Sequence, residues 1–187
     1  MKLMSTREVE LESTVGGLTA KGKLHTLSVW FILALRLMIG LAFLQSGVDK
    51  VLSGEFSASG YLQNAPPANG SPVADLFVSM GNTPWFVDFV NIAVPWGEVL
   101  IGLGVLLGAM TRLAAFFGAF MMLLFYLGNW DVAHGYINGD FAYMLVFLSV
   151  AAFGAGRIFG LDRYIESYEI DGQPLVERYP WARYFLG

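Results

Sequence analysis

Cysteine is absent from this chain of 187 residues, and histidine occurs only twice, as His25 and His134. Without a thiol there is no disulfide, no thiolate metal site, no iron–sulfur ligand and no cysteine nucleophile. Two histidines offer few ligands for a haem or a metal ion. We therefore expect no covalently bound or ligated cofactor and no metal site.

Charged side chains are also scarce. Only 14% of the residues are charged, with 11 Lys and Arg against 15 Asp and Glu, whereas 56% are hydrophobic. An average soluble domain has about a quarter charged residues. So few charges cannot cover a soluble domain of this size, and clustered Lys and Arg for phosphate contacts are missing. The composition excludes a soluble enzyme, a disordered chain and a nucleic-acid binder, and it indicates an integral membrane protein.

The apolar residues form four runs with very few charges. A helix that crosses a bilayer needs about 20 mainly apolar residues. The sequence therefore predicts an all-α, polytopic membrane protein whose four transmembrane helices form an antiparallel bundle within residues 27–162. The predicted spans cover about 27–47, 84–108, 111–129 and 141–159.

Lys and Arg are concentrated on one predicted side of the membrane. They occur in the segment 1–26, in the turn between the second and third spans and in the tail 163–187, whereas Lys50 alone occurs in the two opposite loops. Because cytoplasmic loops carry an excess of Lys and Arg, we expect a cell-membrane protein with both termini in the cytoplasm. The aromatic residues of the tail are typical of the headgroup layer, so we expect this tail to be interfacial.

The loop 49–83 is long for a simple connection. Residues 65–70 read Ala-Pro-Pro-Ala-Asn-Gly, which is typical of a turn. Ser71 and Pro72 then favour a short helix over VADLFVSM, lying on the outer surface of the membrane. This helix is either a lid over an outward-facing cavity or an interfacial anchor.

Two charges interrupt the first two spans, Arg36 and Glu98. Counted from the inner end of each span, both are about 13 Å above the cytoplasmic face at 1.5 Å per residue. Equal depth on consecutive antiparallel helices predicts that they face each other. Charge inside the hydrocarbon is costly and is a sign of function by default. The pair is either a structural ion pair or the lining of a cavity that binds a polar headgroup or relays a proton.

Three segments resemble the motifs of the DoxX/DoxD family. LRLMIGLAFLQSGVDKV is similar to its first-helix motif, WGEVLIGLGVLLGAMTRLAA to its second-helix motif and GAGRIFGLDRYI to its closing motif, over about residues 33–165. The chain departs from many relatives near Gln45, where they have His, and near the start of the last helix, where they often have Glu and this chain has Asp140. The positions that match the motifs are Arg36, Gly40, Gly47, Lys50, Glu98, Gly102, Gly108, Arg112, Gly154, Gly156, Arg157, Leu161 and Asp162.

The resemblance implies a small four-helix membrane protein. The best-known members of the family are subunits of a thiosulfate:quinone oxidoreductase. On this basis we expect an integral membrane subunit of a quinone-linked oxidoreductase that oxidises a small sulfur anion such as thiosulfate. Lys50 is the candidate outer contact for the anion, and quinone is expected between the helices near Arg36 and Glu98. Another subunit or a second copy of the chain is the expected protein partner. The alternatives are a non-catalytic scaffold subunit and a pathway for a small solute or protons.

Overall fold

The computed structural model describes residues 9–15, 18–24, 26–130 and 135–187, so His25 and His134 lie outside the described residues. Four helices make up the body of the molecule: α1 (Thr26–Ser53), α4 (Pro84–Leu107), α5 (Thr111–Gly128) and α6 (Gly139–Ala152). An antiparallel hairpin of β1 (Val9–Val15) and β2 (Leu18–Leu24) precedes them. This hairpin was not predicted from the sequence.

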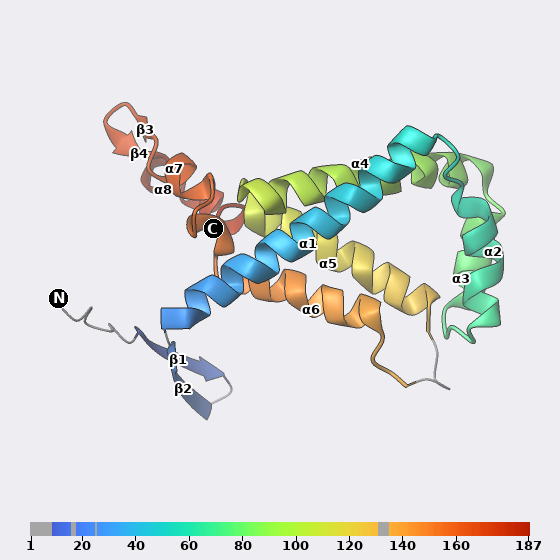
Figure 1. Cartoon of the computed structure of the whole chain (residues 1–187), viewed down its shortest axis with the longest axis horizontal. Coiled ribbons are helices and arrows are strands. Elements are labelled where there is room, and N and C mark those ends of the chain that lie inside the picture. Colours follow the sequence, from blue (N-terminus) through green and yellow to red (C-terminus); the bar gives the residue numbers. More distant parts are fainter. Residues whose placement is uncertain (1–8, 16–17, 25, 131–134) are drawn as a thin grey trace.

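The four helices run antiparallel and form a closed ring. α1 packs against α4 and α6, and α5 packs against the same two helices (Figure 1). The core between them is apolar, and Phe43 meets Phe147 edge to face with ring centroids 4.7 Å apart. Its buried members include Ile39, Phe43, Ile101, Val105, Met122, Phe147 and Val150. The predicted antiparallel four-helix fold is confirmed.

α1, α4 and α5 are long and apolar enough to cross a membrane, and α6 is a shorter apolar helix. α6 does not reach position 159 as predicted, because Gly154 takes a left-handed conformation with φ 59° and ends it after Ala152. At 1.5 Å per residue it spans about 21 Å, less than the hydrocarbon core of about 30 Å. The chain continues into the 3₁₀ turn η1 (Ala155–Arg157).

Glycines on facing sides of α1 and α4 set how these two helices meet. A Cβ at Gly40 would lie 2.9 Å from the backbone nitrogen of Leu106, and one at Gly102 would overlap the backbone of Leu44. A Cβ at Gly47 would lie 2.6 Å from the nitrogen of Val99. Small residues let membrane helices approach this closely. These contacts fix the register of α1 along α4.

Two helices cover one end of the bundle, α2 (Ala58–Ala68) and α3 (Ala74–Gly81) (Figure 1). The predicted short helix is α3, although it begins at Ala74. The predicted turn over 65–70 is wrong for residues 65–68, because α2 continues through Pro66 and Pro67 to Ala68, and only Asn69 and Gly70 form a turn. Neither proline has an N–H to donate, but their carbonyls accept from Ser71 N at 2.9 Å and Gly70 N at 3.2 Å.

The tail folds at the opposite end of the bundle, the end from which α1 starts (Figure 1). The sequence predicted an interfacial tail, and the structure adds that its last residues return to the bundle, with Ala182, Leu186 and Gly187 buried. Its elements are α7 (Asp162–Glu166), β3 (Glu169–Ile170), β4 (Gln173–Pro174), α8 (Leu175–Arg178) and η2 (Pro180–Tyr184).

Candidate functional site

Arg36 and Glu98 have different partners. The Nη1 of Arg36 donates to the carbonyl oxygens of Ala155 at 2.6 Å and Ile158 at 2.7 Å. Glu98 instead forms an ion pair with Lys50, with 2.6 Å between Nζ and Oε2. The predicted contact between Arg36 and Glu98 is therefore wrong, although both side chains are buried as expected, 2% and 4% exposed.

The register of α1 along α4 explains the error. Arg36 lies at the end of α4, since a Cβ at Gly108 would be 2.9 Å from its Nη1, whereas Glu98 lies against Gly47. Eleven residues of helix separate Arg36 from Gly47, which is about 17 Å. Depths counted from the ends of hydrophobic runs assumed that both helices begin at one level, but the first turns of α1 extend beyond the end of α4.

Lys50, Glu98 and Ser46 form a polar cluster toward the end of the bundle that α2 and α3 cover. Lys50 is in the last turn of α1, and its Nζ donates to Ser46 Oγ at 2.5 Å and to Glu98 Oε2 at 2.6 Å. An ammonium group has three N–H donors. Within the described residues Ser46 and Glu98 accept from two of them, so the third remains for a ligand. The pairing offsets part of the cost of burying the Glu98 carboxylate.

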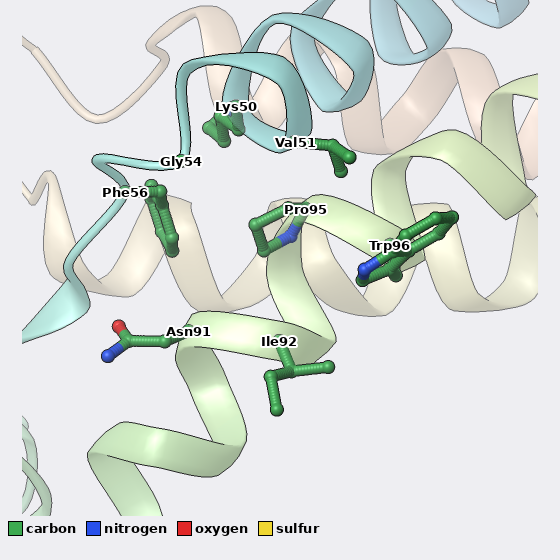
Figure 2. A pocket seen from close by; sticks show the side chains of 8 residues that line it. All are labelled: Lys50, Val51, Gly54, Phe56, Asn91, Ile92, Pro95 and Trp96. Carbon is green, nitrogen blue, oxygen red and sulfur yellow. The ribbon is translucent and has the colours of Figure 1, made fainter.

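A pocket of about 160 Å³ opens beside this ion pair (Figure 2). Residues from the end of α1 and from the segment after it form one side, and α4 forms the other. Ile92 and Trp96 on α4 are 65% and 53% exposed, so the pocket opens on the outer surface of the bundle, where a membrane protein meets lipid. Its lining consists of Lys50, Val51, Gly54, Phe56, Asn91, Ile92, Pro95 and Trp96.

Hydrogen bonds join α2, and the segment between α2 and α3, to the bundle, and one of them is made by Asn91 of the pocket. Asn91 Oδ1 accepts from the backbone N–H of Ala58, the first residue of α2, at 2.8 Å. Tyr61 donates its hydroxyl to Asn129 Oδ1 at 2.9 Å, and Ser71 donates to the carbonyl of Leu127 at 2.6 Å. Burial and then the charge of Asp140 raise the pKa of Tyr61 to about 12. Tyr61 therefore keeps its proton and its hydrogen bond at neutral pH.

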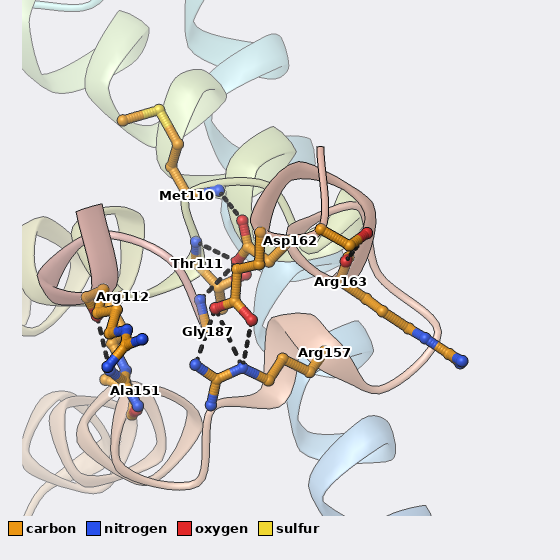
Figure 3. A network of polar contacts seen from close by, with 11 residues as sticks. Met110, Thr111, Arg112, Ala151, Arg157, Asp162, Arg163 and Gly187 are labelled. Atoms are coloured by element: carbon orange, nitrogen blue, oxygen red, sulfur yellow. Dashed lines mark hydrogen bonds and ion pairs between the residues drawn. The ribbon is translucent and has the colours of Figure 1, made fainter. Parts of the chain in front are cut away.

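Asp162 is the centre of a second polar network at the other end of the bundle (Figure 3). Its side chain is fully buried. One oxygen accepts from the backbone N–H of Met110 at 2.7 Å, and the other accepts from Thr111 at 2.9 Å and Gly187 at 3.1 Å. The carboxylate thus caps the start of α5, where a negative charge is favourable, and holds the last described residue. Its role in this structure is to join these segments.

Arg112 and Arg157, two other positions of the family motifs, tie the same end of the bundle together. Arg112 donates to the carbonyls of Ala151 at 3.3 Å and Arg183 at 2.7 Å, and Arg157 pairs with Glu166 at 2.8 Å.

Glycines make room for the charges at this end. A Cβ at Gly156 would overlap Asp162 Oδ2, and Gly108 ends α4 with φ 68°. Gly40, Gly47 and Gly102 thus serve the contact of α1 with α4, whereas Gly156 gives room to the carboxylate of Asp162.

Ser46, a contact of Lys50, and Asn91, which lines the pocket, were not named as site residues from the sequence. Ser46 is four residues before Lys50, so the helical period places the two on one face. This spacing was the signal that could have identified it. The contact between Asn91 and Ala58 joins residues 33 positions apart, and no local pattern marks it. Within the described residues there is no group of three or more His, Cys, Asp or Glu that could hold a metal ion.

Comparison with known proteins identifies the family. No curated protein and no solved structure matches the chain. A family model described as DoxX matches residues 31–135, more than half of the 187 residues. The matched region includes Arg36, Lys50 and Glu98, whereas Asp162 lies beyond it. With its helical membrane fold and this match, the chain belongs to the DoxX family.

Proposed function

We propose that this chain is an integral membrane subunit of a quinone-linked oxidoreductase and that the pocket beside Lys50 and Glu98 receives the quinone headgroup. The observation that supports this most is a partly buried ion pair beside a pocket, with both polar and apolar lining residues, that opens sideways from the bundle. Ionisable residues inside a membrane protein commonly mark substrate or proton paths. A lipid-soluble substrate reaches such a pocket from within the bilayer.

The polar groups fit a quinone carbonyl. The remaining N–H donor of Lys50 binds the carbonyl oxygen, and Glu98 stabilises the ammonium. Reduction to the quinol takes up two electrons and two protons. Lys50 transfers one proton to the oxygen it binds and is then reprotonated from water, and water supplies the second proton to the other quinone oxygen, so that both protons come in the end from the outer aqueous phase. In this proposal the electrons come from a small sulfur anion such as thiosulfate, oxidised with the help of another subunit.

The size of the pocket indicates which part of the ligand it holds. Pockets that enclose a whole drug-sized ligand have volumes of about 300–1,000 Å³, and this one has about 160 Å³. It therefore takes the carbonyl end of the ring, and the hydrocarbon tail lies along Ile92 and Trp96 in the lipid. Because Glu98 compensates the charge of Lys50, a neutral carbonyl suits this pocket better than an anion does. The contact of Lys50 with a sulfur anion stays a prediction.

Photolabelling with a short-chain azidoquinone tests the site in the purified protein. We expect the label in the peptide that contains Trp96. Lys50→Met should weaken labelling about tenfold or more, because a hydrogen bond from a charged donor is lost. Glu98→Gln should also weaken it, because Lys50 loses its counter-ion. Asp88→Asn is the matched control, since Asp88 is an exposed acid on the same helix. Equal labelling of all variants, or a label near Arg36 instead, would contradict the site.

The proposal includes an orientation with both termini in the cytoplasm and α2 and α3 outside. Ser57 and Ser167 are exposed and lie at opposite ends of the bundle. Since the natural chain lacks cysteine, Ser57→Cys and Ser167→Cys each introduce a single thiol. On intact cells an impermeant maleimide should label the first variant and spare the second, and permeabilised cells should label both. Labelling of Ser167→Cys alone on intact cells would reverse the orientation.

A further inference from the structure

The polar cluster of Lys50, Glu98 and Ser46 determines the direction in which the Lys50 side chain points. Lys50 is in the last turn of α1, close to the level at which a long basic side chain can reach the headgroup layer and water. Its ammonium instead contacts Ser46 and Glu98, and it lies 5.9 Å from the ring centre of Phe56. Both polar partners hold the side chain toward the bundle.

We propose that Ser46 is a positioning residue that keeps Lys50 directed into the pocket. This inference rests on the proposed function only for its consequence for quinone binding. The Oγ of Ser46 accepts from Nζ at 2.5 Å, and Glu98 accepts at 2.6 Å. Two acceptors on different helices fix the ammonium in two directions, so the third donor is left in one orientation beside the pocket. With Glu98 alone, the ammonium could rotate about a single contact and reach outward.

The backbone around Ser46 is shaped for this contact. In a helix the side chain of residue i+4 leans toward the N-terminal turn, which brings Lys50 over Ser46. The neighbouring Gly47 has no side chain, and a Cβ there would lie 2.9 Å from the Cβ of Glu98. The glycine thus lets Glu98 approach α1 beside Ser46. The hydroxyl of Ser46, the ammonium of Lys50 and the carboxylate of Glu98 therefore meet because Ser46, Gly47 and Lys50 have this spacing on α1.

The test measures how exposed the Lys50 amine is, without any quinone. An impermeant sulfonated succinimidyl ester acylates Lys50 in proteoliposomes, and mass spectrometry of the peptide gives the rate. Ser46→Ala should raise the acylation rate about fivefold, because the loss of one typical hydrogen bond increases the population of outward-directed Lys50 side chains by about that factor. Ser46→Thr keeps a hydroxyl at the same place and should restore the natural rate. Glu98→Gln is the positive control and should also react faster. Alanine is the best helix former, so Ser46→Ala should fold normally.

A natural rate in Ser46→Ala together with a raised rate in Glu98→Gln would overturn the positioning role. Unchanged rates in both variants would overturn the whole cluster. With the azidoquinone as probe, Ser46→Ala should weaken labelling about fivefold, again by one hydrogen bond, and leave the labelled peptide unchanged. A faster acylation with unchanged quinone labelling would support the role of Ser46 and contradict the quinone site, which separates the two proposals.

Discussion

Asp162→Ala should lower the free energy of unfolding by about 3 kcal/mol, because it leaves three backbone N–H groups, two buried and one partly buried, without an acceptor. The donors belong to Met110, Thr111 and Gly187. Two of them begin α5, where the first N–H groups have no helical partner. The substitution therefore damages the start of a membrane helix and the attachment of the tail in one step.

Thermal unfolding in detergent and limited proteolysis measure these two effects separately. We expect a lower melting temperature and faster cleavage within residues 175–187. Asp162→Asn should be milder, since the amide keeps one oxygen as an acceptor. Asp75→Ala is the control, because Asp75 is exposed and surface substitutions usually stay within about 0.5 kcal/mol. A loss as small as that in Asp162→Ala would show that the network does not stabilise the fold.

The second large effect concerns the ion pair of Lys50 and Glu98. Breaking a fully buried pair costs about 3–5 kcal/mol, and we expect a smaller loss here because the Lys50 side chain is 27% exposed. Glu98→Leu should cost about 2 kcal/mol by leaving Lys50 without its partner. Lys50→Leu should cost a similar amount by leaving the buried carboxylate unpaired. The double variant should recover much of the loss, since two apolar residues leave no unpaired charge.

The single and double variants of the preceding paragraph form one double-mutant cycle, and a second cycle with Arg36 tests which basic residue Glu98 contacts. Contacting residues show interaction energies of about 0.5–3 kcal/mol, whereas distant ones are additive within about 0.5 kcal/mol. Lys50→Leu with Glu98→Leu should be non-additive. Arg36→Leu with Glu98→Leu should be additive, because Arg36 binds the carbonyls of Ala155 and Ile158 instead. Strong coupling between Arg36 and Glu98 would contradict the register of α1 on α4.

Local sequence features predicted helices well and their ends less well. The helix at α3 was expected from its apolar spacing, but α2 was not, because Pro66 and Pro67 are typical of turns. Each proline lacks the N–H of an i→i−4 helical bond, and α2 ends at Ala68, directly after them, while their carbonyls still accept from Ser71 and Gly70. The fourth span was predicted too long by its apolar run, since Gly154 ends regular helix within that run.

The sequence by itself determined that this is a membrane protein with four apolar helices. A bilayer offers no hydrogen bonds to the backbone, so long apolar runs with few charges must become helices. Arg36 and Glu98 were also evident, because charge within such runs is rare. Lys50 was identified as the lone basic residue of two predicted loops, and Asp162 only through its match to a family motif.

Tertiary structure alone decided which of these charges meet. The contacts of Gly40, Gly47 and Gly102 set the register of α1 on α4, and a shift of about 17 Å along a helix turned an expected pair with Arg36 into a pair with Lys50. Likewise, Asp162 joins α5 to the tail through donors at least 25 positions away in the chain. Depth along separate hydrophobic runs does not specify such partners, because it is the close contact of two backbones that fixes their relative height.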